Sequence, residues 1–143
     1  EYLVFNGNVG IKVTPTHVID LSGGAYSNGA TWSNASDRNL KENFEEVDGQ
    51  AILGLIDELP LLKWNYISDS AEIKHIGPVA QDFYSLFKLG NDDTSISTID
   101  PSGIALAAIK ELSAQNRSMK DQIESQKQQI EELRKLVEEL MKK

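Results

Sequence analysis

The chain has 143 residues, no cysteine and a formal net charge of −8. The length leaves room for about one domain, and the absence of cysteine excludes disulfides and thiolate metal sites. The acidic excess lies in residues 1–108, because residues 109–143 carry eight Lys/Arg and seven Asp/Glu, and an acidic surface argues against a nucleic-acid partner.

Two further classes of site have little support. No apolar run approaches the ~20 residues that span a bilayer, so we expect a soluble chain with no membrane partner. The two histidines, His17 and His75, are far apart in different contexts. We therefore expect no metal ion and no cofactor.

Residues 1–35 alternate short strand-like pieces with turn residues. The pieces are residues 2–5, 9–13 and 16–21, and the pair Asn6-Gly7 forms a turn between the first two. The stretch has too few large apolar side chains to bury a core alone. We predict the end of a larger β-rich structure that continues upstream and is stabilised by other chains; a flexible linker is the alternative.

Residues 36–108 predict a small mixed domain. An amphipathic pattern over 36–59 predicts a helix, with Ser36 and Asp37 as N-cap types and Pro60 as its stop. Alternation at 62–67 and 73–77 predicts a β-hairpin. Pro78 then begins a short helix that ends at Gly90, and residues 95–99 predict a last strand.

The C-terminal third predicts a coiled coil. Asp100-Pro101 is a strong helix start, and a heptad repeat of about five heptads begins at Ile109. Position a holds Ile109, Asn116, Ile123, Ile130 and Val137, and position d holds Leu112, Met119, Gln126, Leu133 and Leu140. The polar pair in this seam, Asn116 and Gln126, is typical of residues that fix register or oligomeric state. The repeat leaves two and three strands both open.

A serine and a lysine, Ser36 and Lys41, lie five residues apart at the boundary between the β-rich stretch and the mixed domain. A hydroxyl needs a base before it attacks a carbonyl at neutral pH, and a desolvated lysine amine can be that base. A serine in this place is nevertheless more often a helix cap. Residues five apart in a regular helix point about 140° apart, so a dyad requires the chain to bend between them.

A second serine–lysine pair, Ser85 and Lys88, has the Ser-x-x-Lys spacing of penicillin-binding enzymes. The Ser-Asp-Asn and Lys-Thr-Gly companions of those enzymes are missing. We interpret this pair as part of an ordinary helix.

Several motifs together resemble the peptidase S74 family, the intramolecular chaperone domains of phage tailspikes and tail fibres. They cover about residues 30–115 and are, in order, Thr31-Trp32-Ser33-Asn34-Ala35, Ser36-Asp37-x-x-Leu40-Lys41-x-Asn43, Trp64-Asn65-Tyr66, His75-Ile76-Gly77-Pro78-Val79-Ala80-Gln81-Asp82 and Ile109-Lys110-Glu111-Leu112. Pro78 departs from the family's usual large apolar residue, which affects packing of the hairpin more than chemistry.

The resemblance implies an α+β homotrimer in three parts. Residues 1–35 would be the end of a trimeric β-helical stalk, residues 36–108 a globular domain with a hairpin arm, and residues 109–143 a coiled coil. Such a domain trimerises, helps the upstream stalk of its own chain to fold, and then releases itself by autoproteolysis. The setting would be a virion tail-fibre or tailspike precursor made in the cytoplasm of the host bacterium.

Carried onto this chain, the resemblance makes Ser36 the nucleophile and Lys41 its general base, in a single-turnover serine endopeptidase that acts on itself. We expect cleavage between Ala35 and Ser36, with the bond between Ser36 and Asp37 as the alternative. Burial on trimer closure, or the nearby charge of Arg38, would help Lys41 to lose its proton. The alternatives to this function are a structural trimerisation cap that never cuts and an adhesin tip.

Overall fold

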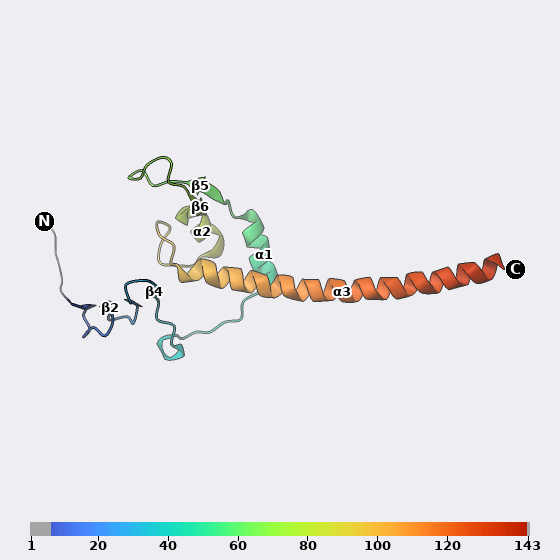
Figure 1. The fold of residues 1–143 in the computed structure, drawn as a ribbon, viewed down its shortest axis with the longest axis horizontal. Helices are drawn as coiled ribbons and strands as arrows, with labels where there is room; N and C mark the ends of the chain where they lie inside the picture. Colours follow the sequence, from blue (N-terminus) through green and yellow to red (C-terminus); the bar gives the residue numbers. More distant parts are fainter. Residues whose placement is uncertain (1–6, 143) are drawn as a thin grey trace. The chain divides into compact units, whose positions relative to one another are not determined.

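The computed structural model describes residues 7–142, so the strand expected at residues 2–5 lies outside the described residues. The described chain combines small sheets, short helices and a long C-terminal helix (Figure 1). This confirms the α+β character that the sequence predicts. The chain separates into two compact units, Glu1–Glu46 and Val47–Lys143, which we call unit 1 and unit 2.

Unit 1 contains a sheet of four very short strands in the order β1-β2-β3-β4. These are β1 (Val9–Ile11), β2 (Ile19–Leu21), β3 (Tyr26–Ser27) and β4 (Trp32–Ser33). The pair β1–β2 is parallel and the other pairs are antiparallel. Strands β1 and β2 confirm two predicted pieces, each shorter than expected, while β3 and β4 fall in a stretch for which no strand was expected from the sequence.

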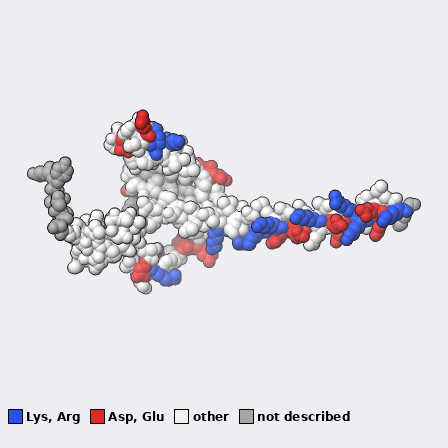
Figure 2. Space-filling view, viewed as in Figure 1, with Lys and Arg blue, Asp and Glu red and all other residues white. Residues whose placement is uncertain are grey.

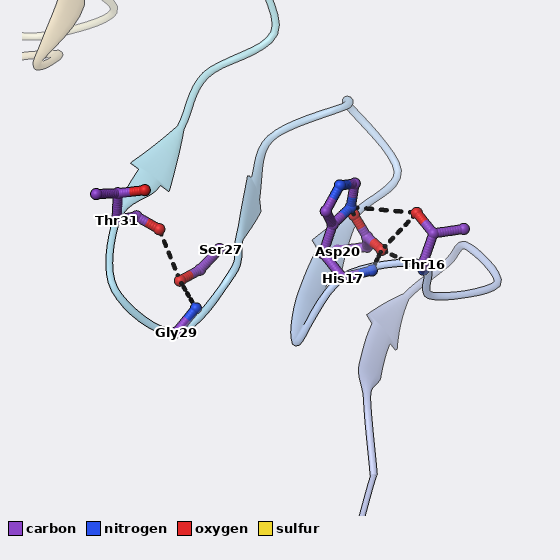
Figure 3. Close-up of polar contacts among 6 residues, drawn as sticks. All are labelled: Thr16, His17, Asp20, Ser27, Gly29 and Thr31. Atoms are coloured by element: carbon purple, nitrogen blue, oxygen red, sulfur yellow. Dashed lines mark hydrogen bonds and ion pairs between the residues drawn. The ribbon is translucent and has the colours of Figure 1, made fainter.

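Side-chain hydrogen bonds hold the turn between β3 and β4. The hydroxyl of Ser27 donates to the carbonyl of Thr31 and accepts from the backbone N–H of Gly29 (Figure 3). Asn28 Oδ1 accepts the N–H groups of Ala30 and Thr31, each at 3.1 Å. These polar contacts, rather than apolar packing, define this corner of the sheet.

Asp20 is the most buried polar residue of the described chain. Its carboxylate accepts the backbone N–H of His17 at 2.8 Å and a bond from His17 Nδ1 at 2.8 Å (Figure 3). The backbone N–H of Thr16 also donates to it, and the His17 ring stacks on Tyr26 at 3.7 Å. The hydrogen bond from the His17 backbone is the main reason that the pKa of Asp20 falls to about 2.

Unit 2 contains three α-helices and a hairpin. Helix α1 (Gly49–Glu58) packs against α3 (Ile99–Met141) with its N-terminal end and rises steeply from it, and α2 (Ala80–Phe87) follows the hairpin β5–β6 (Figure 1). Strands β5 (Leu62–Trp64) and β6 (His75–Gly77) pair antiparallel, with Trp64 opposite His75, which confirms the predicted hairpin. The buried apolar residues of the described chain are Phe83 of α2 and Ile104 and Ala108 of α3, so α2 and the first part of α3 supply the core.

Only the first part of helix α3 packs against other parts of unit 2. Every residue from 116 to 142 is exposed. Lysine, arginine and acidic side chains are interspersed along this projecting part (Figure 2). The helix expected from Asp100 begins at Ile99, and all ten predicted heptad residues lie on it.

Three predicted elements need correction. The helix predicted over 36–59 is present only in its second part: residues 41–48 have no regular structure, and α1 begins at Gly49 because Asp48 Oδ1 accepts the N–H of Ala51 at 3.0 Å. The strand predicted at 95–99 is wrong, since Asp92 Oδ1 accepts the N–H groups of Thr94 and Ser95 and holds a loop there.

The short helix after the hairpin is present, but it ends earlier than expected. Its C-cap is Lys88, whose φ of 54° is left-handed, so the helix stops before Gly90. Pro78 stands just outside it, because the N-cap is Val79.

Candidate active site

The candidate residues Ser36 and Lys41 flank one turn of 3₁₀ helix, Arg38–Leu40. Asp37 precedes the turn in an extended conformation, with φ −62° and ψ 135°, and Lys41 follows it at φ −130° and ψ 148°. Two backbone hydrogen bonds close the turn, from Leu40 to Asp37 and from Lys41 to Arg38, both of 3.1 Å. The chain therefore turns back on itself between the serine and the lysine.

This bend brings the two candidate side chains together. Lys41 Nζ donates a hydrogen bond of 2.8 Å to Ser36 Oγ. That separation is within the range in which a base can take a proton from a nucleophile. Both residues are exposed in the single chain.

The turn itself is fixed by the residue after the serine. Asp37 Oδ1 accepts the backbone N–H of Asn39 at 2.9 Å and the side-chain amide of Asn39 at 3.0 Å. The sequence suggested Asp37 as a cap, but of a long helix. It caps a single 3₁₀ turn instead. The sequence signal for this role is an Asp or Asn whose side-chain oxygen can accept the backbone N–H two residues later.

Two neighbours of the dyad have contacts of their own. The guanidinium of Arg38 lies over the ring of Phe44, 4.7 Å from its centroid, in a cation–π contact. Ala35 is half-buried, and it lies against Gly24 of the turn between β2 and β3. Sequence reasoning missed Gly24, because nothing in a Gly-Gly turn signals which residue it will meet.

The second serine–lysine pair is not brought together in this way. The Ser85 hydroxyl donates to the Asp82 carbonyl at 2.8 Å, within α2. The Lys88 ammonium lies over the ring of Tyr84 at 5.4 Å. Both contacts suit an ordinary helix end.

Among residues 7–142, no three His, Cys, Asp or Glu side chains gather in a group that could hold a metal ion. None of the helices described has the length and apolar character needed to cross a bilayer.

One family model matches the segment of the chain that begins at Ser36. The arrangement is that of a small α+β domain with a serine–lysine contact at its start. Residues 36–88 match the family model Peptidase_S74, described as chaperone of endosialidase. This segment, which begins at Ser36 and runs through Lys41, α1, the hairpin and α2, therefore carries a Peptidase S74 chaperone-of-endosialidase domain. No curated protein matches the chain.

Proposed function

We propose that this chain is a self-cleaving trimerisation chaperone that folds with an upstream β-helical stalk and then cuts itself free. Ser36 is the nucleophile and Lys41 the general base. The observation that carries the proposal is the 2.8 Å contact between Lys41 Nζ and Ser36 Oγ, at the first residue of the family match. Family membership supplies the chaperone class, and the contact supplies the chemistry.

The reaction begins with a proton transfer along that contact. In the structure the Lys41 amine donates a hydrogen bond to Ser36 Oγ. Once that amine is neutral, it can accept a hydrogen bond along the same line and take the proton of Ser36 Oγ. Burial when three copies close favours the neutral amine. In the single chain the contact is open to solvent, so cleavage waits for assembly.

The bond changes follow from that step. Ser36 Oγ bonds to the carbonyl carbon of Ala35, and Lys41 then returns the proton to the Ser36 nitrogen as the peptide bond breaks. An ester joins Ala35 to Ser36 Oγ. Water hydrolyses it, leaving a carboxylate on Ala35 and a free hydroxyl and amino group on Ser36. Cleavage between Ser36 and Asp37 is the alternative.

Exposed apolar surface supports the trimer. The eight apolar residues of the predicted heptad seam are each 50% or more exposed. In proteins most helical stability comes from packing of an apolar face. Two further copies of the chain would supply that packing.

The charge pattern beside the seam supports parallel helices. The e positions include the cations Lys120, Lys127 and Arg134, and the g positions include the neutral residues Gln115, Gln122 and Gln129. Antiparallel packing would bring e against e and cation against cation, whereas parallel packing brings e against g. Parallel packing also places the N-terminal ends of the three α3 helices together at one end of the bundle.

The partners in this proposal are two further copies and the stalk of the same chain. The setting is a phage tail fibre or tailspike precursor, made in the bacterial host. The three parts are residues 1–35 as the end of the stalk, 36–108 as the chaperone and protease core, and 109–143 as the coiled coil.

Denaturing mass spectrometry tests the proposal on a longer chain that carries more of the stalk. Wild type is compared with Ser36→Ala and Lys41→Ala, and light scattering gives the oligomeric state. We expect a trimer in all three, and two fragments that join at Ala35–Ser36 in wild type alone. Wild type that stays whole but trimeric would overturn the protease and leave a structural cap or adhesin tip. A monomer would overturn the trimer.

A further inference from the structure

Residues 37–40 carry the Lys41 side chain to Ser36. A lysine side chain loses much conformational entropy when it is held in one geometry, and the Lys41 side chain is exposed. The position of its backbone therefore decides how often Nζ reaches Ser36 Oγ.

The turn that sets this backbone is short. It has two backbone hydrogen bonds of 3.1 Å, and a lone 3₁₀ turn has poor hydrogen-bond geometry and little stability by itself. The residues that follow have no regular structure up to Asp48. Asn43 adopts a left-handed φ of 53°. No helix therefore continues from the turn to hold it.

The carboxylate of Asp37 supplies what the backbone lacks. Its Oδ1 accepts both the backbone N–H and the side-chain amide of Asn39, at 2.9 and 3.0 Å. These two bonds tie Asn39, the middle residue of the turn, to the side chain of Asp37. Asp37 directly follows the proposed nucleophile in the chain.

We propose that Asp37 is a positioning residue for self-cleavage: its carboxylate holds the 3₁₀ turn that delivers Lys41 Nζ to Ser36 Oγ. This inference rests on the proposed function. Asp37 acts as a hydrogen-bond acceptor, so its charge is not required, and asparagine, which keeps Oδ1, can replace it.

The test measures cleavage rate and its pH profile in the full chain with its stalk. Asp37→Ala removes the acceptor, and we expect the rate to fall about 10- to 100-fold, because small displacements of a catalytic group have effects of that order. Asp37→Asn should retain the rate within about threefold, since asparagine and aspartate are near-equal caps. Asp37→Asn should also keep the wild-type pH profile.

The cleavage rates of the two Asp37 variants decide whether the inference holds. Equal rates in Asp37→Ala and wild type would overturn the inference. So would a slow Asp37→Asn with a shifted pH profile, which would mean that the charge acts on the protonation of Lys41. Light scattering confirms that each variant assembles. If wild type itself stays whole, it is the proposed function that has failed.

A separate contact involves Ala35, the residue on the N-terminal side of the proposed scissile bond. Gly24 has φ +84°, and a Cβ built there would lie 3.0 Å from the Cβ of Ala35. The Gly24 N–H donates to the carbonyl of Leu21 at 2.9 Å, which fixes the turn against which Ala35 lies. The Ala35 methyl therefore lies against the Gly24 backbone, so branching at the Cβ of residue 35 adds bulk at this contact.

We infer that Gly24 makes cleavage selective for a small residue at position 35. Ala35→Val adds bulk at this contact without changing a left-handed residue, and we expect it to slow cleavage about tenfold or more. Ala35→Gly should cut as wild type does. The control is Gly23→Val, because a Cβ at Gly23 meets nothing within 4 Å. Cleavage of Ala35→Val at the wild-type rate would overturn this inference, whatever the result for Asp37.

Discussion

The first residue of α1, Gly49, lies against the backbone end of the Glu111 side chain on α3. A Cβ built at Gly49 would stand 2.8 Å from the Cβ of Glu111 and 3.3 Å from its Cγ. Real Cβ atoms do not approach so closely, and Glu111 Cβ cannot swing away because it is fixed to the helix. The two helices meet at this point only because position 49 has no side chain.

We therefore expect Gly49→Ala to lower the free energy of unfolding of unit 2. Overpacking of this kind costs about 1–3 kcal/mol, which exceeds the gain from better helix propensity. Urea unfolding followed by circular dichroism measures the change.

The matched control is Gly54→Ala in the same helix, where a Cβ meets nothing within 4 Å. There the substitution should raise the free energy of unfolding by about 0.5–1 kcal/mol. If both variants were stabilised alike, the close approach of α1 to α3 would not exist in solution.

A second prediction concerns the start of α1. Asp48 Oδ1 accepts the N–H of Ala51 at 3.0 Å, so Asp48→Ala should cost about 1 kcal/mol of stability and Asp48→Asn much less. Thermal unfolding of the three proteins tests this. Asp57→Ala, near the other end of the helix, should not destabilise, because an acidic residue is unfavourable there.

The start of α1 also explains where sequence reasoning failed. The apolar pattern runs on through Phe44 and Val47, but both side chains are exposed, and the chain between Lys41 and Asp48 is not helical. Periodicity reports which residues would share a face if a helix formed. It does not register a polar side chain such as Asp48 that starts the helix later.

Other elements differ in how well the sequence could predict them. The hairpin and α3 have strong patterns, of alternation and of heptads, and both are found. Strands β3 and β4 have two residues each and depend on contacts of Ser27 and Asn28, which leave no periodic trace. For the site, the sequence names Ser36 and Lys41, whose roles stay a proposal. The bend that joins them includes two hydrogen bonds to one side-chain acceptor, Asp37, which looked like a helix cap.

A third prediction concerns pH and the Asp20 cluster. The pKa of Asp20 is lowered from 3.8 to about 2. A depressed carboxyl pKa stabilises the folded state above the unfolded value, so this contribution is complete above pH 3.8 and is lost as the pH falls toward 2. Asp20→Asn, which cannot ionise, should lack this pH dependence.

Trp32 offers a local probe for the measurement. Replacing Trp64 by phenylalanine leaves Trp32, in β4 of unit 1, as the only tryptophan. Urea unfolding at pH 5 and pH 2.5 then compares wild-type Asp20 with Asp20→Asn. The aspartate protein should lose more stability between the two pH values. Equal losses would show that the hydrogen bonds of Asp20 do not distinguish its charged form.

The last prediction separates assembly from the fold of the single chain. Ile130 and Leu133 are 54% and 61% exposed, so changing both to glutamate removes little packing from one copy. In the proposed trimer these residues lie in the seam, and charges there would be buried without partners. We expect the double variant to be monomeric by analytical ultracentrifugation and to lose helix signal, because the projecting part of α3 is marginal alone.

The control changes charge without touching the seam. Gln128→Glu lies at heptad position f, on the side away from a and d, and it should stay trimeric. Cleavage should follow assembly, with fragments from Gln128→Glu and none from the double variant. A double variant that remained trimeric would show that the heptad is not the seam. One that cut as a monomer would show that the Ser36–Lys41 contact does not wait for three chains to close around it.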